Sequence, residues 1–197
     1  MSSQVAESPR AVPSARDLRS QWLGAVGVVV VLFLVVFGGF IVSRALSKPV
    51  GPPIVVGDSV AVQPLSGWEQ TDIPPLLDTP RVRLTRGTAS LDVTAPIVGA
   101  GSPTQLLRRY VAGIMEPEAS QLEVSEEIQQ VTLPTGDAVR VTYAGHFDGS
   151  PTRIEGEVTA AIAPDGTGVL YDAWGPENVF GYSLTDTEHM IEGAAYV

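Results

Sequence analysis

The chain has 197 residues, a formal net charge of −10 and no cysteine, which excludes disulfides, thiolate nucleophiles and lipid attachment through cysteine. The charge is unevenly divided, because residues 1–47 carry a net charge of +2 and residues 48–197 a net charge of −12. So acidic a soluble part argues against binding to nucleic acid or to an anionic membrane surface.

An uncharged apolar segment of 21 residues follows a short polar tail. A helix of that length rises roughly 30 Å, the thickness of the hydrocarbon core of a bilayer. A signal peptide cleaved after Ser47 is the alternative, but the apolar run is longer than such peptides carry. We therefore predict a disordered tail over 1–21, a transmembrane helix over 22–42 in contact with the lipid bilayer, a tether over 43–53 and one domain over 54–197.

The basic residues flanking this segment predict its orientation. Three arginines precede it, whereas Arg44 and Lys48 follow it. Basic residues are enriched on the cytoplasmic side of membrane helices. We expect a single-pass protein of the cell membrane with a cytoplasmic N-terminus and an extracytoplasmic C-terminal domain.

The first part of the domain combines a short strand with a proline-rich segment. Alternating apolar residues predict a strand over 60–65, and Trp68 follows a turn at Gly67. We interpret Trp68 as a core residue or as a lid on an open end of the core, with a ligand platform as the alternative. Residues 71–80 contain three prolines and are expected to form a loop.

The clearest hairpin signal lies over residues 81–94, where apolar and polar residues alternate on both sides of Gly87. This pattern places Arg81 and Arg83 on one face of the hairpin. Two arginines there either grip a carboxylate or phosphate of a ligand, or form cross-strand pairs within the domain, with Asp92 as a partner.

A helix is predicted over residues 103–115. Ser102 is expected to cap it, with Pro103 at the first helical position and Gln105 completing a capping box. Apolar residues recur there at spacings of three and four, and Pro117 ends the pattern. We expect the apolar face of this amphipathic helix to pack against a sheet.

Strands and turns alternate from residue 121 to residue 174, with one or two strands over 122–133. Tight turns connect antiparallel strands, so we expect an antiparallel meander. A second capping box, at Thr185 and Glu188, predicts a helix that continues to the last residues. The fold class is therefore α+β, with a mostly antiparallel sheet covered by two helices.

The sequence carries no recognisable reaction motif or phosphate-binding loop. The sequence has only two histidines, His146 and His189, and each would need partners from distant parts of the chain to form a metal or general-base site. Glu155 and Glu157 are interpreted as an exposed strand edge. We expect no catalytic residue, no metal and no cofactor.

Several short segments resemble a known group of proteins: Gly67-Trp68, 83–87 with 89–93, Leu106-Leu107 and Met190-Ile191. In these segments and in the order of its elements, the region 54–197 resembles the Mog1/PsbP-like α/β/α sandwich and single-pass membrane proteins of mycobacteria and related actinobacteria. One lysine beside eleven arginines is typical of such GC-rich genomes. The resemblance implies a domain that binds other proteins and has no catalytic residues.

Three functional hypotheses follow from this sequence. The first is a membrane-anchored accessory domain that docks on an envelope protein or assembly. The second is a carrier or sensor of a small envelope ligand, held between sheet and helix and contacted by Trp68, Tyr143 and Trp174. The third and least favoured is a hydrolase that uses His146 with a carboxylate.

Overall fold

The computed structural model describes residues 49–76 and 78–197. The predicted tail 1–21, the predicted membrane helix 22–42 and the first part of the tether lie outside these residues. Within the described part of the chain, no helix is both long enough and apolar enough to span a bilayer.

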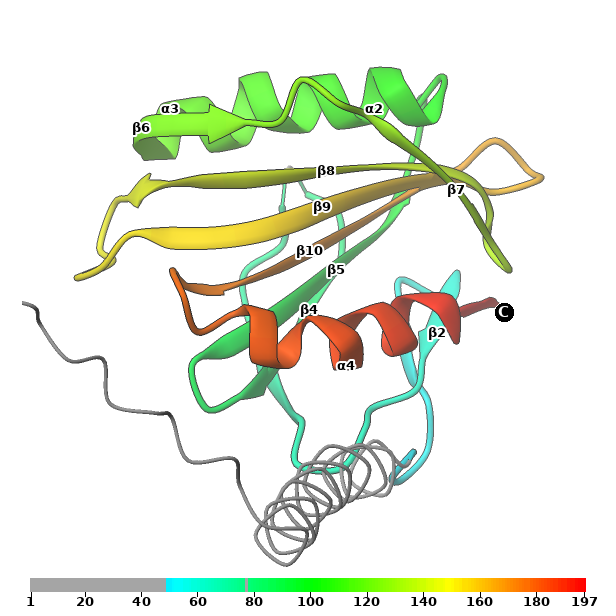
Figure 1. The fold of residues 1–197 in the computed structure, drawn as a ribbon. Coiled ribbons are helices and arrows are strands. Elements are labelled where there is room, and N and C mark those ends of the chain that lie inside the picture. Colours follow the sequence, from blue (N-terminus) through cyan, green and yellow to red (C-terminus); the bar gives the residue numbers. More distant parts are fainter. Residues whose placement is uncertain (1–48, 77) are drawn as a thin grey trace, which may run out of the picture. The chain divides into compact units, whose positions relative to one another are not determined.

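The main sheet has eight strands, and every pairing in it is antiparallel, as predicted (Figure 1). Their order across the sheet is β3-β4-β5-β10-β9-β8-β6, and β7 also pairs with β8. The strands are β3 (Glu69–Asp72), β4 (Arg81–Arg86), β5 (Ala89–Ile97), β6 (Ala119–Val124), β7 (Gln129–Leu133), β8 (Gly136–Phe147), β9 (Ile154–Ile162) and β10 (Gly168–Pro176).

Two layers cover the opposite faces of this sheet (Figure 1). A continuous helical segment lies on one face and consists of α2 (Pro103–Tyr110), the π-helical turn η1 (Val111–Met115) and the short α3 (Glu116–Glu118). The other face packs against α4 (Gly181–Glu192) and a small second sheet, in which β2 (Val60–Val62) lies between β1 (Ile54–Val56) and β11 (Ala195–Tyr196). The predicted α+β fold is confirmed.

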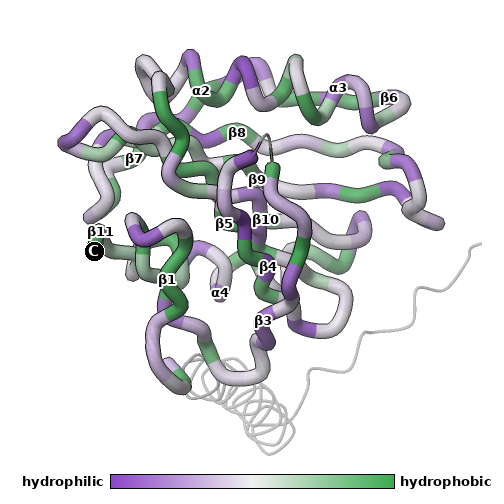
Figure 2. Tube along the Cα trace, turned by 180° about the vertical axis from the view of Figure 1, so that it is seen from behind, coloured by the Kyte–Doolittle hydropathy of each residue, from purple (hydrophilic) through white to green (hydrophobic). Residues whose placement is uncertain are grey.

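The sequence pattern explains the hairpin and the first helix. Apolar and polar residues alternate along β4, as the hydropathy colouring shows (Figure 2). Leu84 therefore points into the α4-side core, whereas Arg81 and Arg83 face α2. Ser102 and Gln105 form both hydrogen bonds of the predicted capping box, each 3.2 Å long.

The predicted C-terminal helix has the wrong boundaries. It begins at Gly181 rather than Thr185 and no side chain caps it. It also ends at Glu192 rather than continuing to the last residues, because Ala195 and Tyr196 pair with β2. Val197 is therefore 73 % exposed and does not face the core.

Further differences concern short strands. The predicted loop 71–80 overlaps β3, an exposed edge strand whose polar sequence carries no apolar alternation. β1 was not predicted, and the region 122–133 forms two strands, which both pair with β8. Glu155 and Glu157 do not lie at an edge, since β9 runs between β10 and β8.

Candidate functional site

A cavity of about 440 Å³ lies between the helical segment and the main sheet. It is lined by aromatic and apolar side chains from α2, η1, β8 and β10, and by a central group of charged side chains from β4, β5 and β10. We call this cavity the central cleft. Its size falls within the range of small-molecule sites in proteins.

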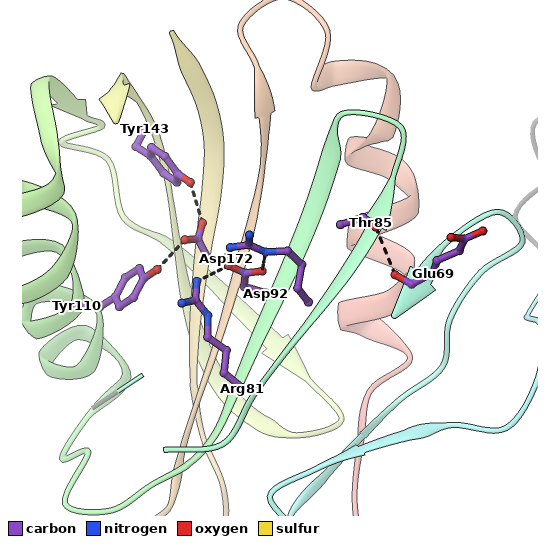
Figure 3. A network of polar contacts seen from close by, with 8 residues as sticks. Glu69, Arg81, Thr85, Asp92, Tyr110, Tyr143 and Asp172 are labelled. Atoms are coloured by element: carbon purple, nitrogen blue, oxygen red, sulfur yellow. Dashed lines mark hydrogen bonds and ion pairs between the residues drawn. The ribbon is translucent and has the colours of Figure 1, made fainter. Parts of the chain in front are cut away.

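Asp92 accepts hydrogen bonds from two arginines at the floor of the central cleft (Figure 3). The Nε and Nη2 atoms of Arg83 lie 2.5 and 2.7 Å from the carboxylate oxygens of Asp92. Arg81 donates to the same carboxylate through Nη2. The register explains this, because Arg83 is directly opposite Asp92 and Arg81 is two residues away on the same face. The hydrogen bond with Asp92 raises the pKa of Arg83, against the opposing effect of burial.

Asp172 lies opposite Asp92 on the neighbouring strand β10. Tyr110 donates a hydrogen bond of 2.6 Å to its Oδ2 atom, and Tyr143 donates one of 2.8 Å to its Oδ1 atom (Figure 3). Burial, together with the charge of Asp92, raises the pKa of Asp172 to about 6, although both tyrosine hydrogen bonds act in the opposite direction. Burial also raises the pKa of both tyrosines, so they remain hydroxyl donors.

The hydrogen bond between Tyr143 and Asp172 requires a glycine at position 156 on the strand between them. Tyr143 is paired with Gly156 in the register of β8 and β9, and Gly156 is paired with Trp174 on β10. A Cβ atom at Gly156 would lie 2.6 Å from both Cζ and Oη of Tyr143. Because Gly156 has no Cβ atom, the ring of Tyr143 can lie over β9, and its hydroxyl can contact Asp172 on β10.

The structure brings four of the six predicted binding residues together. Arg81, Arg83, Tyr143 and Trp174 all line the central cleft, and the guanidinium of Arg83 lies 5.0 Å from the ring centre of Trp174. This distance is typical of a cation–π contact. The predicted cross-strand pairing with Asp92 is present, and it does not exclude a ligand contact.

The other two predicted residues lie elsewhere. Trp68 is buried in the core on the α4 side, where its Nε1 atom donates to Asp186 over 3.3 Å and its ring contacts the guanidinium of Arg86. His146 is exposed on β8, and the alternation of this strand places it on the face opposite to Tyr143. Neither residue lines the central cleft.

Sequence reasoning missed Tyr110 and Asp172. Tyr110 was assigned only to the apolar face of its helix, and 62 residues separate it from Asp172. One signal was available, because Asp172 is a lone carboxylate within the apolar stretch 169–174. A charged residue in such a stretch is buried only when it has partners.

A second polar group lies on the other face of the sheet, under α4. Arg140 on β8 contacts Glu157 at 2.9 Å and Glu188 of α4 at 3.0 Å. Burial is the main cause that raises the pKa of Glu157 to about 7, while the charge of Arg140 lowers it. This group links α4 to the sheet.

The polar groups in the central cleft are already engaged with one another. Both carboxylate oxygens of Asp172 accept hydrogen bonds, and Asp92 is neutralised by two arginines. Among residues 49–76 and 78–197, no three histidine, aspartate or glutamate side chains are placed to hold a metal ion. The cleft therefore offers aromatic surface and guanidinium donors to a ligand.

Comparison with known proteins gives a structural likeness only. No protein-family model matches the sequence, and no curated protein matches it. Among solved structures, cyanobacterial PsbP (CyanoP) from Synechocystis sp. PCC 6803 superimposes with a TM-score of 0.51 at 12 % sequence identity, over 71 % of this chain and 88 % of that chain. At this identity the likeness shows the fold alone, and the domain has a PsbP-like fold.

Proposed function

We propose that this protein is a non-catalytic binding protein that holds a small, partly apolar ligand in the central cleft. The observation that carries the proposal is the cavity of about 440 Å³, whose lining combines aromatic rings with a few charged side chains. Such a combination is typical of sites that recognise small molecules. Hydrogen bonds fix the orientation of the charged groups before a ligand arrives, which favours affinity.

In this proposal the segment 22–42 anchors the domain to the outer side of the cell membrane. Its apolar length and the arginines that precede it support this arrangement. A reporter enzyme that is active only after export, fused after Val197, tests the topology. Activity is expected, whereas silence of the fusion together with activity of an N-terminal fusion would reverse the orientation.

Native mass spectrometry of the domain, purified from its own host, tests ligand binding. We expect an adduct on the wild-type protein and none on the Ile114→Trp variant, because Ile114 lines the cleft and a larger side chain would fill it. Tyr182→Ala is the matched control, since Tyr182 is 86 % exposed on α4 and should leave the adduct unchanged. A wild-type mass without adduct would count against the proposal.

A second candidate is docking on an envelope protein. Val179 and Tyr182 are 47 % and 86 % exposed, and they are the sequence neighbours of Phe180 and Gly181, which help to line a groove of about 520 Å³. Exposed tyrosines beside apolar grooves are frequent in protein interfaces. A photo-crosslinking residue in place of Tyr182 should capture one reproducible partner in cells, and the same residue in place of the exposed Glu126 should not.

A further inference from the structure

A second cavity adjoins the central cleft along α2. Its volume is about 640 Å³, and it shares Leu76, Tyr110 and Ile114 with the central cleft. Its apolar lining comes from Pro80, Pro96, Ile97, Leu106 and Leu170, with the 84 % exposed Val98. It is also lined by Asp78, Thr79, Thr94 and Arg109. We call this cavity the apolar extension. The two cavities therefore lie side by side, and the central cleft is the more charged of the two.

The lining of the central cleft contains two arginines, Arg81 and Arg83, and four carboxylates, but both arginines lie at its floor. Two guanidiniums face the single carboxylate of Asp92. The Nε atom of Arg81 is buried and has no hydrogen-bond partner among the described residues. Asp92 accepts hydrogen bonds from only three of the N–H groups of the two guanidiniums, and the arginine side chains are 19 % and 26 % exposed, so further donors remain for an oxygen acceptor of a ligand.

The acidic residues around the cleft do not remove this preference. Asp172 uses both oxygens to accept from Tyr110 and Tyr143, so it does not hydrogen-bond to the arginines. Glu118 and Asp148 line the mouth but are exposed to solvent, where water and salt screen their charge. Arg81 and Arg83 are only partly exposed, so their charges are screened less and act more strongly on a ligand at the cleft floor than these two carboxylates do.

We propose that the joined cavities bind an anionic amphiphile, with a carboxylate or phosphate head at Arg81 and Arg83 and an unbranched alkyl chain in the apolar extension. Guanidinium groups bind both kinds of oxyanion through paired hydrogen bonds. Strand β5 rises about 3.3 Å per residue, so the distance from Asp92 to Ile97 is about 16 Å, roughly the length of a twelve-carbon chain. This inference rests on the proposed ligand-binding function and specifies its ligand class.

Calorimetric titration with four twelve-carbon probes tests the ligand class. The fragment Ser47–Val197 is suitable, because it forms a compact unit of its own and the cores of the described chain begin at Val56. Dodecanoate and dodecyl phosphate, below their micelle concentrations, should bind with 1:1 stoichiometry. Dodecanol and dodecyltrimethylammonium should bind at least about tenfold more weakly, because they lack the charge-assisted hydrogen bonds.

Two variants separate the contributions of head and chain. Arg81→Gln should weaken dodecanoate binding about tenfold and leave dodecanol binding unchanged, because it removes a charged donor but no apolar surface. Ile114→Trp should weaken binding of both probes, since Ile114 lines both cavities. Arg108→Gln is the matched control, because Arg108 is exposed on α2 and lines neither cavity, so this variant should bind both probes as the wild type does.

The possible failures are distinguishable. Binding of dodecanol or dodecyltrimethylammonium as tight as that of dodecanoate would overturn the anionic class and leave the binding function standing. Adsorption to phosphatidylglycerol vesicles without 1:1 binding of the free probes would also overturn it, in favour of a membrane surface. Absence of binding by all probes, together with a native mass free of adduct, would overturn the proposed function itself.

Discussion

Asp92 and Asp172 lie directly opposite each other on β5 and β10, both buried on the face that α2 covers. Their charges are compensated separately, by two arginines for Asp92 and by two tyrosine hydroxyls for Asp172. The tyrosine hydroxyls carry no charge, so a carboxylate with these partners remains costly to ionise in a buried place. Burial is therefore the main cause of the raised pKa of Asp172, and the charge of Asp92 adds to it.

The stability of the domain should fall as the pH rises from about 4 to about 6. The pKa of Asp172 is raised from 3.8 to about 6 on folding, so between these values the folded chain binds more protons than the unfolded chain. Protonated Asp172 contributes up to about 3 kcal/mol to the free energy of unfolding. This contribution is fully present below the unfolded pKa and is lost as the pH rises past the folded pKa. Urea unfolding across this pH range measures the change.

Asp172→Asn is the matched variant for that experiment, because it removes the titrating group and keeps the side-chain volume. Its free energy of unfolding should vary less with pH between 4 and 6 than that of the wild type. Glu157→Gln is measured beside it, since the pKa of Glu157 is also raised, to about 7. An Asp172→Asn profile identical to the wild-type profile would show that Asp172 does not titrate in this range.

Removing one tyrosine hydroxyl should raise the pKa of Asp172 above about 6. Tyr110 and Tyr143 both donate to its carboxylate and thereby favour the ionised form. Tyr110→Phe takes away one of these hydrogen bonds without changing the packing of the ring. Carbon-13 NMR titration of the aspartate carboxyls measures the shift, and Tyr182→Phe, at an exposed position, should leave it unchanged.

Gly156→Ala should destabilise the domain by about 1–3 kcal/mol, the cost of leaving a buried polar group without its hydrogen bond. The added methyl group would lie 2.6 Å from the Tyr143 hydroxyl and 2.6 Å from the backbone oxygen of Ala173, so the tyrosine ring would have to move away from Asp172 and the neighbouring strand would be strained as well. Chemical denaturation gives the free energy of unfolding. Gly181→Ala is the control, because a Cβ atom there meets no atom within 4 Å, and a loss of the same size in this variant would refute the explanation.

Ser102→Ala should reduce stability by about 1 kcal/mol, as for other capping residues replaced by alanine. The Ser102 hydroxyl accepts a hydrogen bond from the backbone nitrogen of Gln105, and the Gln105 side chain accepts one from the backbone nitrogen of Ser102. The melting temperature reports the loss. Ser120→Ala should change it little, because the hydroxyl of Ser120 makes only a 3.5 Å contact with His146.

Sequence reasoning succeeded where neighbouring residues determine the structure. The hairpin around Gly87 and the helix after Ser102 have local signals, namely alternation over a few residues and a capping box within one turn. The start of α4 was misjudged because Thr185 and Glu188 imitate such a box inside a helix that begins at Gly181. A local motif cannot reveal that Phe180, which precedes it, is already fixed in the core.

The site was only partly predictable for a similar reason. Arg83 and Asp92 lie on consecutive strands, so a hairpin register was enough to suggest their pairing. The meeting of Tyr110 with Asp172 depends on how the helix crosses the sheet, and no sequence spacing encodes this. β11 was missed as well, because the Ala195–Tyr196 pairing with β2 joins segments more than a hundred residues apart.

The small sheet joins the two ends of the domain. β2 lies between β1, which precedes it in the chain, and β11, which ends at Tyr196. During synthesis the chain leaves the ribosome from its first residue onward, so one edge of β2 stays open until nearly the whole domain has emerged. The pairing of Ala195 and Tyr196 with β2 thus closes the edge of an early strand of the domain with a late one, and a domain cut before Ala195 would expose this edge of β2.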